Sequence, residues 1–66
     1  MTITNRYNVN IDFDTAVNLM DDDTREAIHA TGNYDDDPQG FSEAYAAAHL
    51  DKFEQPWELD KPNPVY

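Results

Sequence analysis

The fold is decided by residues 13–32, FDTAVNLMDDDTREAIHATG, where apolar residues recur at helical spacing around three consecutive aspartates. Apolar side chains three and four residues apart share one face of a helix. The residues at these positions are Phe13, Ala16, Val17, Met20, Ala27, Ile28 and Thr31. Because the pattern is interrupted around Asp23 and Thr24, it predicts either one helix from Thr15 to Thr31 or two shorter helices that meet near the aspartates.

We favour two helices, because Asp23 and Glu26 have the spacing of a capping box that would start a second helix. Consecutive aspartates also suit a helix N-terminus, where the helix dipole favours negative charge. We expect Asp14 to cap the first helix and Gly32 to end the second.

Before this stretch, apolar and polar residues alternate from Ile3 to Phe13, which predicts a half-buried strand. A single strand cannot satisfy its own backbone hydrogen bonds, so it must pair with another segment. The candidates are the segment from Trp57 to Leu59 and the same strand of a second chain. The sequence therefore leaves open a monomer or a homodimer.

After this stretch, residues 33–37 form a polar loop, and Asp37 followed by Pro38 is typical of a helix start. The predicted helix runs from Pro38 to about Phe53, with Phe41, Ala44, Tyr45 and Ala48 on one face. The following segment is rich in proline, and Trp57 and Leu59 are expected to anchor it.

Together these elements predict a small α+β domain with an N-terminal strand, two or three helices and a C-terminal segment that is a candidate second strand. We expect residues 1–60 to form one compact acidic domain and residues 61–66 to form a flexible tail. A domain of 66 residues has little room for an enclosed active site. The chain has no cysteine, which excludes disulfides and thiolate metal sites. No apolar run approaches the length of a membrane span, and the expected location is the cytoplasm of the host cell.

The negative charge is concentrated in one part of the chain. Of the 14 acidic residues, which give a formal net charge of −10, most lie in residues 12–37, where Arg25 is the one basic residue. Such a surface repels nucleic acids and anionic membranes and attracts basic surfaces. The candidate contact residues are Asp12, Asp14, Asp21, Asp22, Asp23, Glu26, Tyr34, Asp35, Asp36 and Asp37. We expect a basic protein partner, with no direct binding of nucleic acid and no membrane contact.

The sequence contains no clear pattern of a metal-binding or catalytic site. Asp35, Asp37, Gln39 and Gly40 match the first positions of a calcium-binding EF-hand loop, but Ala46 stands where the loop needs a bidentate glutamate. Neither histidine has a nucleophile or a second ligand at a useful spacing. Paired carboxylates need an apolar pocket to act as acid and base, and a solvated aspartate triplet offers none. We therefore expect no metal, no cofactor and no enzymatic activity.

One set of residues carries a resemblance to a known class of proteins. The set is residues 16–23 (AVNLMDDD), Arg25-Glu26, Ile28-His29, Asp37, Gln39, Phe41, Ala44-Tyr45, His49, Lys52-Phe53 and Trp57. This pattern resembles the small acidic anti-CRISPR proteins of phages and other mobile elements, in particular inhibitors of type I-C systems. The resemblance implies a non-enzymatic inhibitor that binds a CRISPR effector subunit and occludes the surface meant for target DNA.

Charge and resemblance lead to one hypothesis, in which the acidic residues imitate DNA in a basic channel of the effector. Two alternatives remain. The chain could be an acidic inhibitor or regulator of another DNA-binding protein, such as an antirestriction or antitoxin-like factor. It could also be a domain from a salt-loving host, whose charge serves solubility only.

Overall fold

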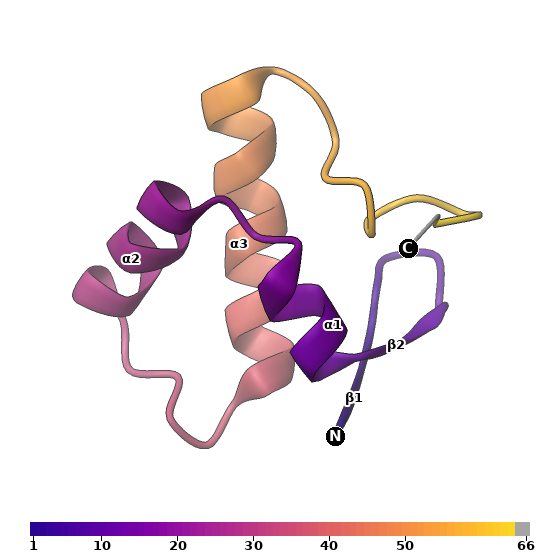
Figure 1. The fold of residues 1–66 in the computed structure, drawn as a ribbon, viewed down its shortest axis with the longest axis horizontal. Coiled ribbons are helices and arrows are strands. Elements are labelled where there is room, and N and C mark those ends of the chain that lie inside the picture. The colour runs from indigo at the N-terminus through magenta and orange to yellow at the C-terminus, as the bar shows by residue number, and fades with distance from the viewer. Residues whose placement is uncertain (65–66) are drawn as a thin grey trace.

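The computed structural model of the chain describes residues 1–64, which form a two-stranded antiparallel sheet followed by three helices (Figure 1). The elements are β1 (Thr2–Thr4), β2 (Asn10–Asp12), α1 (Phe13–Asn18), α2 (Asp22–Thr31) and α3 (Pro38–Phe53). In Figure 1, α3 lies between α2 and the β-hairpin, and α1 follows directly from β2. The predicted α+β class is therefore confirmed.

The N-terminal segment differs from the single strand predicted over residues 3–13, because it folds back on itself as a hairpin. Ile3 pairs with Ile11 in the antiparallel register. The Asn5 side chain accepts hydrogen bonds from two backbone N–H groups of the turn, at 2.9 and 3.1 Å. Asn8 adopts a left-handed conformation with φ of 65°, which asparagine tolerates better than most residues. The two asparagines thus make a turn inside what looks like one alternating strand.

The segment around Trp57 to Leu59 is not a strand, so the predicted pairing with it is also wrong. It is attached through side chains instead: Trp57 and Leu59 are buried, which confirms them as anchors. The Asn5 amide donates to the Leu59 carbonyl at 2.8 Å. Arg6 donates to the buried Asp60 carboxylate at 2.8 and 2.5 Å. Pairing of the hairpin with a second chain stays a prediction.

The break between the first two helices is confirmed, but both N-caps lie two residues earlier than predicted. Asp12, not Asp14, caps α1, and Asp21, not Asp23, caps α2. Capping by the first aspartate of the triplet places the next two in the first turn of α2, where the helix dipole favours them. Gly32 ends α2, as expected.

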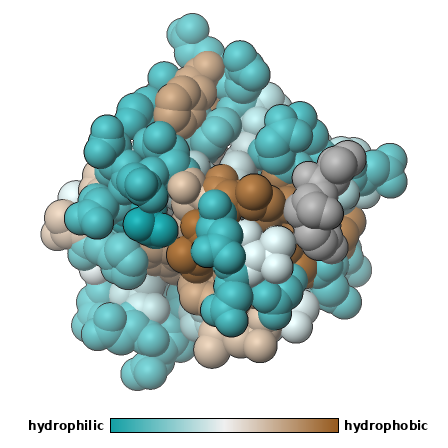
Figure 2. All heavy atoms as spheres, viewed as in Figure 1, coloured by the Kyte–Doolittle hydropathy of each residue, from teal (hydrophilic) through white to brown (hydrophobic). Residues whose placement is uncertain are grey.

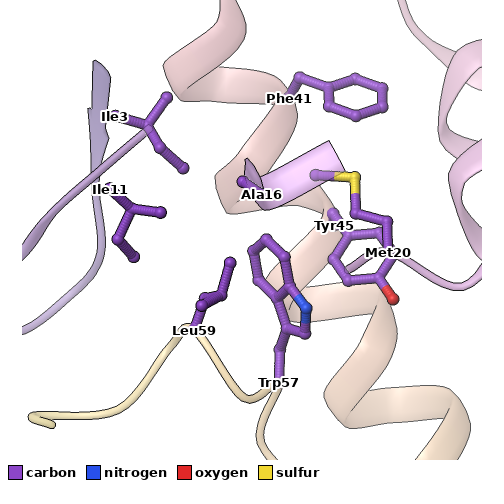
Figure 3. Close-up of a cluster of buried hydrophobic side chains, with 8 residues drawn as sticks. All are labelled: Ile3, Ile11, Ala16, Met20, Phe41, Tyr45, Trp57 and Leu59. Atoms are coloured by element: carbon purple, nitrogen blue, oxygen red, sulfur yellow. The ribbon is translucent and has the colours of Figure 1, made fainter. Parts of the chain in front are cut away.

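Helix α3 has the predicted bounds and supplies the centre of the core. Asp37 caps it, Pro38 opens it, and Glu54 ends it in a left-handed conformation with φ of 56°. The core gathers side chains from both strands, α1, the α1–α2 junction, α3 and the C-terminal segment (Figure 3), and α2 packs the partly buried Ile28 against it. Its members are Ile3, Ile11, Ala16, Met20, Phe41, Tyr45, Trp57 and Leu59.

The predicted flexible tail, residues 61–66, is described only in part. The carbonyl of Lys61 accepts a hydrogen bond from the Asn5 amide at 2.8 Å, so contact with the hairpin extends to this residue. Val65 and Tyr66 lie outside the described residues. The mobility of the tail stays a prediction.

Candidate functional site

Three of the predicted contact residues also stabilise the fold as helix caps. Asp12, Asp21 and Asp37 each accept the backbone N–H of the residue three positions later, at 3.0 to 3.1 Å. A side chain in this position satisfies one of the four N–H groups that a helix start leaves unpaired. Any test of binding at these three residues would therefore also perturb the helices.

The junction between α1 and α2 is fixed by two aromatic side chains from later in the chain. The buried Tyr45 hydroxyl accepts the backbone N–H of Asp21 at 2.7 Å, and the Trp57 indole N–H donates to the carbonyl of Leu19 at 3.2 Å. Both backbone groups lie where the helical hydrogen bonds are interrupted. These two contacts determine where α2 begins, and so where its acidic first turn lies.

The electrostatics of this junction follow from the same contacts. Hydrogen bonds from Thr24 hold the pKa of the Asp21 carboxyl below its usual value, with a smaller contribution from Lys52, whose ammonium lies 3.3 Å away. Burial raises the pKa of the Tyr45 hydroxyl. At neutral pH the first is a carboxylate and the second a neutral phenol.

The remaining acidic residues of α2 project to solvent. Asp22 lies 3.2 Å from Arg25, and its side chain is 84% exposed. Asp23 and Glu26 are exposed. Figure 2 shows hydrophilic residues over most of the visible face, including the side on which α2 lies, and apolar residues near its centre.

A recess of about 630 Å³ brings the predicted contact residue Asp14 together with two others from a later loop, Tyr34 and Asp35. Aromatic rings form part of its lining. The Tyr34 ring packs edge-on against Phe41, with ring centroids 5.8 Å apart, and Phe13 packs edge-on against the same ring at 6.4 Å. The carboxylates of Asp14 and Asp35 are exposed beside these rings.

Sequence reasoning missed some members of this recess. Arg25 and His29 of α2 also line it, and the His29 ring lies 4.6 Å from the Phe41 ring. The helical spacing of Arg25 and His29 (i, i+4) puts them on one face of α2, and this was the available signal.

Several carboxylates of the acidic stretch have no partner within residues 1–64. They accept no hydrogen bond and form no ion pair, unlike the three caps and Asp22. They are Asp14, Asp23, Glu26, Asp35 and Asp36. Their full charge is therefore available to a partner, without first breaking a contact of the fold.

A second hollow, of about 330 Å³, lies between the hairpin, α3 and the C-terminal segment. Its lining is mostly apolar and includes Ile3, Ile11 and Leu59. The buried Ser42 hydroxyl on its wall has no hydrogen-bond partner among the described residues. No sequence pattern indicates this hollow, because the segments that line it are far apart in the chain.

The partial match to a calcium loop does not form a site in the structure. Asp37 is used as a helix cap, and the Gln39 side chain bonds the backbone of Thr4 at 2.8 Å. Within residues 1–64, no group of three or more histidine or carboxylate side chains is arranged to hold a metal ion. In the same part of the chain, no helix is both long enough and apolar enough to cross a membrane. What the site offers chemically is an array of exposed carboxylates next to aromatic rings.

The chain was compared with the models of known protein families. The model of a protein family described as "Anti-CRISPR protein AcrIC5" matches residues 8–57, well over half of the chain. The matched region runs from the hairpin turn through all three helices to Trp57. A search of the curated proteins finds no match.

Proposed function

Because the chain belongs to the AcrIC5 family of anti-CRISPR proteins, and is thus an inhibitor of a type I-C CRISPR system, we propose that it acts by DNA mimicry. The acidic surface of residues 12–37 binds the basic groove of an effector subunit and blocks its target DNA. Inhibition by this route is stoichiometric and involves no turnover.

The observation that carries this proposal is the set of carboxylates that have no partner among residues 1–64. Asp14, Asp23, Glu26, Asp35 and Asp36 lie in the acidic stretch and are exposed. Effectors hold nucleic acid in positively charged channels and read their PAM duplex with arginine. Unpaired carboxylates on a folded scaffold could replace the phosphates that such arginines and lysines contact.

The fold supports the same mechanism at the start of α2. The backbone there is fixed by the Tyr45 and Trp57 contacts, so the segment that carries Asp23 loses little backbone entropy on binding. The domain measures 30 × 27 × 18 Å, so it can also block DNA by its size. It would occupy a groove wide enough for duplex DNA.

A competition assay tests the proposal. A purified type I-C effector loaded with its guide RNA is mixed with a fluorescent target duplex, and DNA binding is measured against inhibitor concentration at several salt concentrations. We expect DNA binding to fall to zero near a fixed molar ratio. We also expect the inhibitor to lose affinity steeply as salt rises, because the contacts are between charges.

Two matched double variants separate this mechanism from a general effect of charge. Asp23→Lys with Glu26→Lys reverses two partnerless carboxylates three residues apart on α2, whereas Asp51→Lys with Glu54→Lys reverses two at the same spacing near the end of α3. Thermal unfolding would establish that both variants fold. We expect the first variant to lose inhibition and the second to keep it. Full inhibition by the α2 variant, or equal loss in both, contradicts the proposal.

A further inference from the structure

The recess beside α1 differs chemically from the rest of the acidic surface. Its two carboxylates, Asp14 and Asp35, stand beside the aromatic rings of Phe13, Tyr34 and Phe41. The acidic residues Asp23 and Glu26 of α2 do not line it. An exposed carboxylate alone attracts any cation, but aromatic faces beside it favour a cation that can also stack.

The charge balance of the recess is negative. Asp14 and Asp35 have no partner within residues 1–64. Arg25 is the opposing cation of the lining, and its guanidinium lies 3.2 Å from the exposed carboxylate of Asp22, which is outside the lining. The lining and this pair together carry two uncompensated negative charges, and a positively charged group is the occupant that complements them.

We propose that this recess receives a single arginine side chain of the partner protein, with Asp14 and Asp35 binding the guanidinium and Tyr34 stacking against it. The inference rests on the proposed function for the identity of the partner, but not for the chemistry of the recess. The recess recognises arginine specifically, whereas the α2 carboxylates attract the partner through charge alone.

Arginine fits this lining better than lysine does. Its planar guanidinium presents several N–H donors at once and stacks on aromatic faces, whereas the lysine ammonium is a compact and strongly hydrated charge. The volume of about 630 Å³ is ample for one such side chain. Tyr34 is half-buried and held against Phe41, so part of its ring is already ordered before binding.

The first measurement uses the free protein and needs no effector. N-acetyl-arginine amide and N-acetyl-lysine amide are titrated separately into the ¹⁵N-labelled protein, and backbone shifts are followed by NMR. We expect the arginine probe to shift the amides of Asp14, Tyr34 and Asp35 more than those of Asp23 and Glu26, and the lysine probe to show less preference. Shifts spread evenly over all carboxylates, or identical responses to both probes, overturn the inference.

The second measurement uses the effector and a control of equal charge change. Asp14→Asn with Asp35→Asn alters the recess, and Asp23→Asn with Glu26→Gln removes two charges outside it. We expect the recess variant to bind the effector about tenfold more weakly than the control does, since hydrogen bonds between charged groups are stronger than general attraction. Tyr34→Leu, which keeps an apolar side chain without a ring, should also weaken binding.

The outcomes of the two measurements are distinguishable. Equal weakening by the recess variant and the control overturns the arginine site and leaves DNA mimicry intact. An effector that does not bind the wild-type protein overturns the proposed function, and the NMR titration still decides whether the recess takes a guanidinium.

Discussion

The contact between Tyr45 and the start of α2 allows a prediction with a calculable size. Tyr45 is fully buried, and its hydroxyl accepts the Asp21 N–H at 2.7 Å. Tyr45→Phe keeps the ring in the core and removes only this acceptor. An unsatisfied buried donor costs about 1–3 kcal/mol. Because Asp21 is only half-buried, water can replace part of the bond, and we expect a loss near the lower limit, about 1 kcal/mol.

The assay is urea unfolding at neutral pH, followed by the fluorescence of Trp57. This is the one tryptophan of the chain and is 4% exposed in the fold, so its emission should change on unfolding. A domain of this size has a stability of roughly 3–10 kcal/mol. A loss of about 1 kcal/mol lowers the melting temperature by about 4–8 °C. The hydrogen exchange of the Asp21 amide should accelerate as well.

Two further variants give the upper and lower references for the stability loss of Tyr45→Phe. Tyr45→Ala removes the ring and should cost about 3–5 kcal/mol, as for other large buried aromatic residues. Tyr7→Phe removes a hydroxyl from a side chain on a residue that is 48% exposed, and it should stay within about 0.5 kcal/mol of wild type. If Tyr45→Phe is as stable as Tyr7→Phe, the hydroxyl does not support the helix junction. If it is as unstable as Tyr45→Ala, the loss comes from packing and the reasoning is refuted.

Three other changes test the fold and the recess. Leu59→Ala opens a cavity at a fully buried position and should cost about 2–5 kcal/mol, whereas Leu50→Ala, at a residue 41% exposed, should cost far less in the same urea assay. The pKa of Asp21 is lowered in the fold, so its contribution to stability is present above its ordinary value of 3.8 and is lost as pH falls through the lower folded value. In Asp21→Asn, the free energy of unfolding should therefore depend less on pH below about 4 than it does in the wild type. The same pH dependence in both proteins would contradict this. Gly32→Ala would place a methyl group in steric overlap with the Tyr34 ring, so the ring must move from its place against Phe41 and its NMR signals should shift.

Predictions that rest on local sequence patterns agree best with the structure. Helix α3 was predicted with its bounds, because its cap, its proline and its apolar face all lie within the helix itself. The break after α1 was predicted for the same reason, although the caps were placed two residues too late. Within DDD any aspartate can cap, and the choice of Asp21 depends on Tyr45 and Trp57, which come from later elements.

The hairpin shows where such local reasoning fails. Alternation from Ile3 to Phe13 is compatible with one long strand or with two short strands that turn at Asn5 and Asn8, since Ile3 and Ile11 share the apolar face in both. Tyr7, which one long strand would place on that face, is exposed in the turn. The second arrangement is stable here because Asn5 satisfies the turn and also ties the hairpin to the C-terminal segment. That tie is a contact between residues at opposite ends of the chain.

The charge of this protein and the extent of its main helix follow from the sequence alone, because charge adds along the chain and helical hydrogen bonds are local. Which carboxylates cap helices and which are exposed depends on the tertiary structure, since it sets where each helix begins. It alone brought Asp14 and Asp35 to one recess against Phe41. A recess exists only where side chains from separate elements pack and leave a space, and no spacing along the chain encodes its shape.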